Sequence, residues 1–352
     1  MIARDTLCVL ATGAFTAVGV TAQAAAAAVR AGISRFAEHE SILDMTGDPA
    51  IVASPPVSRG DMPLEERLLE FIVGAFADAT DAIPDPARLG SLPIILALPE
   101  PRPGIDEQFG RRVAELLSRR LRGLGEIAVL PLGHAAGATA LHQAGGIVRA
   151  GRHNWACVIG AASWITDETI RWLDQNRQLH ALYNAWGFIP GEAAGCTLVS
   201  TLDCARKFAI RPLAILESIG LNVEEVPIKT DGVCLGWGLT KAVKSALAQV
   251  PEDVLVDAIY CDQNGETYRA DEFGFLFARA GKRFRDPSQF EAPADCWGDV
   301  GAATLPLLLT LATQAAARGY ASGTLSMLLS GSEGGHRGAV LVRTPQREGD
   351  AR

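Results

Sequence analysis

The sequence predicts a large α/β fold built from two similar halves, in which helices cover mixed, mostly parallel sheets. Short apolar segments typical of buried strands alternate with longer segments whose apolar residues recur at helical spacing. The same order of elements appears a second time after residue 203. With 352 residues, of which 48% are hydrophobic, the chain is large enough to bury the cores of two such halves.

The first half, residues 1–203, begins with a predicted strand because residues 7–15 are almost entirely apolar. An alanine-rich helix over 21–31 follows and ends at Gly32, a residue type that favours helix C-termini. Residues 64–79 carry an apolar stripe at helical spacing, which predicts a core-facing helix. The other elements expected here are strands over 92–98, 126–130, 155–160 and 194–201, a helix over 111–121, and a helix between Gly133 and Gly151.

The second half, residues 204–343, repeats this alternation of apolar strands and helices. The tail over 344–352 is short, charged and expected to be disordered. The predicted elements of the second half are strands over 214–221, 254–261, 325–330 and 339–343, and helices over 240–249 and 305–317.

Charge and cysteine usage exclude several classes of protein. A net charge of −8 argues against a nucleic-acid binder, which would show a basic surface. The seven cysteines include no CxxC pair, so buried free thiols in a reducing compartment are expected, and the cytoplasm is the predicted location. No uninterrupted apolar stretch is long enough to span a membrane. The sequence also lacks a Walker loop, an HExxH motif and a dinucleotide-binding glycine motif.

Residues 126–163 contain the most informative pattern in the chain. An apolar strand is followed by a tight turn at Gly133, an alanine- and glycine-rich helix closed by Gly151, and a second apolar strand. This pattern resembles the nucleophile region of β-ketoacyl synthases and of the wider thiolase superfamily. Members of that superfamily carry a cysteine at the turn, and the matching residue here is His134.

Three further segments resemble the same family in the same order, namely 187–194, 298–303 and 331–335. The resemblance covers nearly the whole chain. It implies the duplicated thiolase fold, which has five layers in the order αβαβα and two mixed, mostly parallel sheets. It also implies that Gly298, Gly334 and Gly335 line the substrate-binding loops.

The resemblance assigns three positions to the family's chemistry, and all three depart from its pattern. His134 stands at the nucleophile position, Asp299 at the third position, and Asp262 at the second, with Gln263 as the alternative. A condensing enzyme needs a thiolate at a helix N-terminus, where the helix dipole lowers the thiol pKa. An imidazole does not form a comparably stable acyl intermediate, so loss of condensing activity is expected.

Two functional interpretations remain open at this point. In the first, the chain is a silent accessory or binding protein that recognises a partner protein or an acyl group. In the second, His134 and Asp299 perform altered chemistry such as hydrolysis or decarboxylation of an acyl thioester. A histidine between two carboxylates can act as an acid or a base, or can bind a metal weakly. Alternatively, the former active site has lost its function, and its polar groups hydrogen-bond to one another. We expect neither a cofactor nor a metal.

The resemblance also implies partners. In the family, a strand beside the nucleophile turn pairs across a two-fold axis, and residues 155–160 are the expected counterpart. A homodimer or a heterodimer with a related synthase is therefore predicted. Candidate ligands are an acyl carrier protein or a coenzyme A thioester. Proteins with a similar Asp-x-Asn-Gly-Glu segment, here 262–266, are encoded near bacterial secretion genes, so a secreted effector is a further candidate partner.

Overall fold

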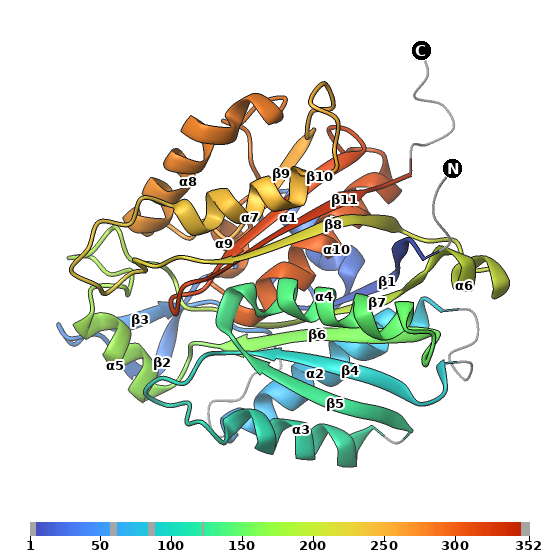
Figure 1. Cartoon of the computed structure of the whole chain (residues 1–352). Coiled ribbons are helices and arrows are strands. Elements are labelled where there is room, and N and C mark those ends of the chain that lie inside the picture. The colour runs from blue at the N-terminus through green and yellow to red at the C-terminus, as the bar shows by residue number, and fades with distance from the viewer. Residues whose placement is uncertain (1–4, 57–61, 84–88, 122, 346–352) are drawn as a thin grey trace.

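A nine-stranded mixed sheet forms the frame of the protein (Figure 1). The computed structural model describes residues 5–56, 62–83, 89–121 and 123–345. The strand order is β5-β4-β6-β7-β1-β8-β11-β10-β9. The strands are β1 (Leu7–Phe15), β4 (Leu92–Leu98), β5 (Leu124–Pro131), β6 (Trp155–Ser163), β7 (Glu192–Thr201), β8 (Ala214–Val223), β9 (Ala258–Cys261), β10 (Leu325–Gly331) and β11 (His336–Arg343).

The helices complete the expected five layers. Helices α2 and α3 lie outside the strands of the first half, and α7 and α8 lie outside those of the second half. Between the two sets of strands lie α1, α4 and α10, and both α4 and α10 contact strands of both halves. The helices are α1 (Ala22–Arg30), α2 (Leu64–Asp81), α3 (Phe109–Arg120), α4 (Ala136–Arg149), α5 (Asp167–Gln175), α6 (Leu202–Lys207), α7 (Trp237–Leu247), α8 (Thr267–Ala280), α9 (Ala294–Trp297) and α10 (Thr304–Arg318).

Strand directions show that the fold is an internal repeat. In the first half β7 alone runs against β1, β4, β5 and β6, and in the second half β11 alone runs against β8, β9 and β10. In both halves the first strand lies where the two sets of strands meet, and the reversed last strand lies next to it. The expected fold class is therefore confirmed. The two sets of strands also join into one hydrogen-bonded sheet, through antiparallel β1 and β8 at Cys8–Ile215 and Val9–Ala214.

The strand proposed for dimer contact needs correction. Residues 155–160 belong to β6, which pairs with β4 on one side and with β7 on the other. An interior strand has no free hydrogen-bonding edge, so it cannot extend the sheet into a second subunit. The edge of the first half is β5, which directly precedes His134 and pairs within the described residues with β4 alone.

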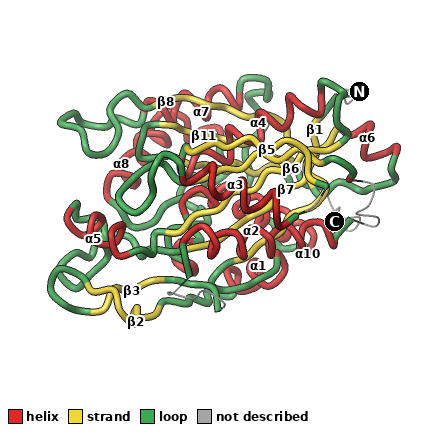
Figure 2. The backbone as a smooth tube through the Cα atoms, turned by 90° about the horizontal axis from the view of Figure 1, so that it is seen from below, coloured by secondary structure: helices red, strands yellow, loops and turns green. Residues whose placement is uncertain are grey.

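Smaller features lie around this frame. Strands β2 (Ala37–Leu43) and β3 (Pro49–Val52) form a separate pair close to α5 (Figure 2). All seven cysteines are free thiols, and five of them are buried. Among the described residues, none of the helices is both long and apolar enough to cross a membrane. Of the tail, Thr344 is buried and its N–H donates to the Thr324 carbonyl, and residues 346–352 lie outside the described residues.

Two glycines at equivalent places allow helices to approach the sheet closely. Gly13 is the seventh residue of β1, and a Cβ there would lie 2.0 Å from the carbonyl oxygen of Ala75 on α2. Gly220 is the seventh residue of β8, and a Cβ there would lie 1.9 Å from the carbonyl oxygen of Ala242 on α7. The same backbone contact thus fixes the outer helix in each half.

Replacing either Gly13 or Gly220 by alanine is expected to lower the free energy of unfolding by about 1–3 kcal/mol, because the added methyl group overlaps rigid backbone. Gly146→Ala is the matched control. It lies on an exposed part of α4 with open space around it, so alanine should raise stability by about 0.5–1 kcal/mol. Urea unfolding measures all three variants, and equal effects at the three positions would refute the close-approach argument.

Candidate functional site

The two central helices begin at the same place in the molecule. Helix α4 is preceded by a 3₁₀ turn, Gly133–Ala135, that carries His134. Helix α10 is preceded by a 3₁₀ turn, Gly301–Ala303, that follows Asp299. The two turns contact each other, and each starts with a glycine of positive φ, 64° at Gly133 and 49° at Gly301. The repeat of the fold therefore brings His134 and Asp299 together.

An ion pair between His134 and Asp299 forms the centre of the site. Nε2 of His134 lies 2.8 Å from Oδ1 and 2.9 Å from Oδ2 of Asp299. The indole N–H of Trp164 and the backbone N–H of Gly301 also donate to Oδ1, at 2.9 and 2.8 Å. The amide of Asn264 donates to Oδ2 at 2.7 Å. Four groups thus donate to a single buried carboxylate.

These donors determine the charge of Asp299. Burial alone would raise the pKa of the carboxyl group. The positive charge and hydrogen bond of His134 outweigh it, with help from Arg269 and the Gly301 N–H, and hold the pKa of Asp299 well below its usual range. Asp299 therefore remains a carboxylate throughout the physiological pH range.

Arg269, in the first turn of α8, is the second cation of the site. Its Nη2 lies 3.5 Å from Nε2 of His134. Its Nη1 donates to Oδ2 of Asp262 at 2.7 Å and to the Gly331 carbonyl at 2.9 Å. The side chain is 4% exposed, so it fills the space between His134 and the ends of β9 and β10.

The second predicted position, Asp262 or Gln263, is not in contact with His134. The carboxylate of Asp262 accepts from Arg269 and from the Gly331 N–H, and reaches the imidazole only through Arg269. The Gln263 amide donates to the backbone carbonyl of Arg269. The residue after β9 that contacts Asp299 is instead Asn264.

Several site residues were missed by the sequence reasoning. Asn264 precedes Gly265, whose φ of 102° marks a sharp turn, so an Asn-Gly pair directly after a buried strand was the available signal. Trp164 follows the last residue of β6 in the same way. Arg269 carried no such signal, because its position in a helix does not reveal which way its side chain points.

Polar contacts continue from the ion pair toward the surface. Asn264 also donates to Glu266 at 3.0 Å, and Gln178 donates to Glu266 at 2.9 Å and to Glu333 at 2.6 Å. Glu333 pairs with Lys229 at 2.7 Å. Burial raises the pKa of Glu266. At Glu333 the Lys229 charge and the hydrogen bonds from Lys229 and Gln178 together outweigh burial and lower the pKa. The chain of contacts ends at Lys229, an exposed residue.

The three glycines assigned to substrate binding have structural contacts in this structure. Gly298 has a φ of 73°, and a Cβ there would lie 2.7 Å from the Ile189 carbonyl. The Gly334 N–H donates to the Glu100 carboxylate at 3.1 Å. A Cβ on Gly335 would lie 2.8 Å from the Glu224 carbonyl oxygen. Each glycine thus fits a close approach or a turn beside the ion pair, and substrate contact remains a prediction.

Among the described residues, no cysteine contacts the His134–Asp299 pair. Cys261 belongs to the outer apolar cluster under α7 and α8, and burial raises its pKa, which keeps it protonated. Within the described residues, Glu224, Cys234 and Glu272 are a group whose ligand atoms lie close enough to share a metal ion. Glu272 is paired with Arg337, and Glu224 accepts from the Gly238 N–H, so internal contacts already use both carboxylates.

Comparison with known proteins establishes the fold. No protein-family profile matches the chain, and no curated protein matches its sequence. The ishigamide ketosynthase/chain length factor superposes with a TM-score of 0.79 at 16% identity, covering 97% of this chain and 100% of that chain. The ketosynthase from module 6 of the bacillaene synthase of Bacillus subtilis 168 gives 0.74 at 12% identity, with 97% and 72% covered.

A third structure is a type II polyketide ketosynthase bound to a hexaketide, in complex with its acyl-carrier protein. It superposes with a TM-score of 0.73 at 14% identity and covers 97% of this chain and 99% of that chain. Identities this low establish the fold alone. The chain therefore has the duplicated, thiolase-like fold of ketosynthases.

Replacing Asp299 by asparagine is expected to lower the free energy of unfolding by about 3–5 kcal/mol near pH 7, because the buried pair with His134 is broken. The depressed pKa of Asp299 means that its stabilisation is fully present above the pKa of an unfolded aspartate, about 3.9, and declines as the pH falls below it. The stability gap between wild type and variant should therefore narrow toward acidic pH in urea unfolding. The exposed Asp271→Asn is the control, and a pH-independent gap would contradict the electrostatic origin.

Proposed function

We propose that this chain is a non-condensing, ketosynthase-fold protein that acts as the catalytically silent partner in a protein assembly. The observation that carries this proposal is the state of the nucleophile turn. The residue there is an imidazole whose Nε2 contacts both oxygens of Asp299, at 2.8 and 2.9 Å. A condensing enzyme requires a thiolate at this helix N-terminus to carry the acyl group.

The backbone around the turn also supports a silent role. Acyl transfer needs free N–H groups aimed at the developing oxyanion. Here the Ala135 N–H donates to the hydroxyl of Ser332 at 2.8 Å, so one donor of the turn is already occupied. His134 is 3% exposed and Asp299 4% exposed, and Arg269 packs against the imidazole. An acyl chain would have to displace these contacts to reach His134.

Altered chemistry is the second candidate, and the His134–Asp299 pair favours it. An imidazole oriented by a carboxylate is the usual arrangement of a general base. Such a pair can support hydrolysis or decarboxylation of an acyl thioester if the site opens. The silent role is preferred because both oxygens of Asp299 contact the same imidazole nitrogen, and buried groups enclose the pair.

Strand β5 is the proposed partner surface. It forms the edge of the first half, and its apolar side chains, including Leu124, Ile127 and Val129, are only partly buried. An unprotected apolar edge is suited to sheet extension across a two-fold axis. We therefore propose a homodimer or a heterodimer with a related synthase, located in the cytoplasm. Acyl carrier protein, a coenzyme A thioester and a secreted effector remain further candidate partners.

Incubation with acyl- and malonyl-coenzyme A thioesters should release no free thiol above background, with wild type or with His134→Ala, because no free nucleophile is present. The matched control is His142→Ala, which changes an exposed histidine on α4. Turnover that disappears in His134→Ala and persists in His142→Ala would establish the altered chemistry and refute the silent role. A stable acyl adduct on any cysteine, detected by mass spectrometry, would refute it as well.

The wild-type chain should be dimeric at micromolar concentration in light scattering after gel filtration. Ala128→Asp should yield monomers, because a two-fold axis places the same charge on both edges. Ala128 lies in the middle of β5, and Ala128→Ser keeps the size of the side chain similar without adding charge. A monomeric wild type, or a dimer that Ala128→Asp leaves intact, would rule out self-pairing through β5.

A further inference from the structure

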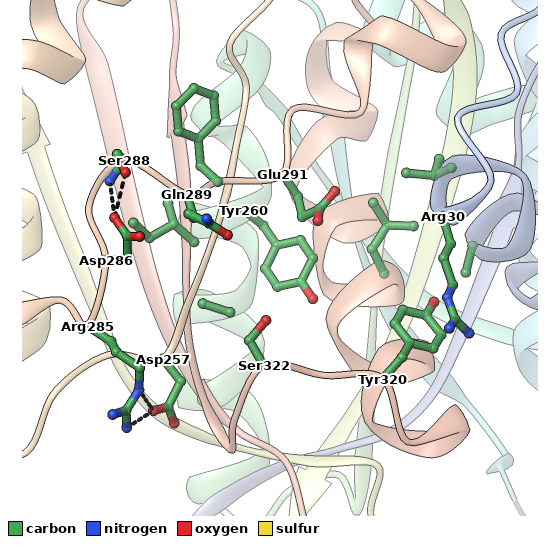
Figure 3. A pocket seen from close by; sticks show the side chains of 16 residues that line it. Arg30, Asp257, Tyr260, Arg285, Asp286, Ser288, Gln289, Glu291, Tyr320 and Ser322 are labelled. Atoms are coloured by element: carbon green, nitrogen blue, oxygen red, sulfur yellow. Dashed lines mark hydrogen bonds and ion pairs between the residues drawn. The ribbon is translucent and has the colours of Figure 1, made fainter.

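A cavity of about 840 Å³ lies away from the His134 site, beside β9. Its walls come from β9, the segment 285–291, and the helices α1 and α10 (Figure 3). This volume is in the usual range of small-molecule sites. The cavity therefore has the size of a binding site, and its chemistry follows from the side chains that line it.

The cavity exists because the chain leaves the edge of β9 and returns to it. Phe284 forms a bridge with Val256, and Glu291 forms one with Tyr260. Residues 286–290 run outward between these two bridges and leave the edge of β9 uncovered around Ala258. The opening is thus bounded by backbone hydrogen bonds at both ends, which fix the positions of Tyr260 and Glu291.

Some polar groups of the wall satisfy one another. Arg285 pairs with Asp257 at 2.6 Å, and the hydroxyl of Ser288 donates to Asp286 at 2.6 Å (Figure 3). Asp257 also accepts from the N–H groups of Thr324 and Leu325. The Arg285–Asp257 pair is neutral, whereas Asp286 keeps its negative charge and accepts hydrogen bonds from Ser288.

Three groups of the wall are not satisfied in this way. Tyr260 is only 6% exposed, its side chain points into the cavity, and its hydroxyl has no hydrogen-bond partner among the described residues. Burial and the charge of Glu291 raise the pKa of Tyr260, so the hydroxyl stays protonated. The Tyr260 hydroxyl therefore faces the cavity and can bond to a ligand or to water. Glu291 is an exposed residue of the lining, and no described residue pairs with its carboxylate.

Arg30 is the third group. Its guanidinium lies 4.0 Å from the centre of the Tyr320 ring and is not paired with any described carboxylate. Stacking on an aromatic ring fixes the plane of the guanidinium while its N–H edges stay free, which suits bidentate binding of a carboxylate. Arg30 and Glu291 both line the cavity (Figure 3).

We propose that this cavity is a binding site for a small zwitterion of the amino-acid type. Arg30 binds the carboxylate of the ligand, Glu291 binds its ammonium group, and the Tyr260 hydroxyl donates or accepts a further hydrogen bond. Arg30 and Glu291 carry opposite charges that no described residue pairs, which matches the two charges of such a ligand, and Asp286 is a further anion of the wall.

Ligand-observed NMR with the free L-amino acids tests this site directly on the full-length protein. At least one amino acid should give saturation transfer with wild type. Arg30→Met and Glu291→Gln should each weaken binding of that amino acid about tenfold or more, because each removes one charge-assisted contact. Tyr260→Phe should weaken it less. Arg171→Met, which changes an exposed arginine on α5, is the matched control and should bind as wild type does.

Acetate and ethylamine are the discriminating probes, because each carries only one of the two charged groups. Both should bind at least about tenfold more weakly than the amino acid. Equal binding of acetate would show an anion site, and no saturation transfer from any amino acid would refute the site. Binding that survives both Arg30→Met and Glu291→Gln would place the ligand elsewhere. Thermal unfolding of each variant shows whether it is folded. If Arg30→Met proves unstable, Glu291→Gln, which preserves the shape of the side chain, still tests the site.

Discussion

The arrangement of the site depends on stabilising the negative charge of one buried carboxylate where the two halves meet. Asp299 is almost fully enclosed, and an ionised carboxyl group in such surroundings is stable only with several donors. His134 and Gly301 come from the two helix starts, whereas Trp164 and Asn264 follow strands of opposite halves. The carboxylate therefore joins four segments that are far apart in the sequence.

The neighbouring charges follow from the same requirement. Arg269 is itself buried, and Asp262 and Glu266 neutralise it at 2.7 and 3.3 Å. The carboxylates of Asp299, Asp262 and Glu266 each contact an opposite charge directly, and the outermost pair is Lys229 with Glu333. Such a network fixes the positions of its members, which suits a stable interface or a rigid scaffold. It leaves few groups free to bind a substrate.

Much of the fold could be predicted from the sequence, because apolar spacing and glycine turns report directly on local structure. The pairing of His134 with Asp299 could also be predicted from the sequence, since both lie beside glycine turns at helix starts. The second position was predicted at Asp262 or Gln263, whereas Asn264 makes the contact with Asp299. The spacing of apolar residues does not show at which residue a short strand such as β9 ends. The edge strand was misassigned because strand order in space does not follow strand order in the chain. Arg269 could not be found, since only packing decides that its side chain points inward.

The position of α4 and α10 has a consequence for how the molecule can be divided. Each of these helices packs against strands from both halves, and the inner face of each set of strands is covered only when both helices are present. A fragment cut near residue 203 would expose a large part of the shared apolar layer to water. Although the chain is a tandem repeat, the inner apolar layer is shared by both copies, and we expect the two copies to fold together.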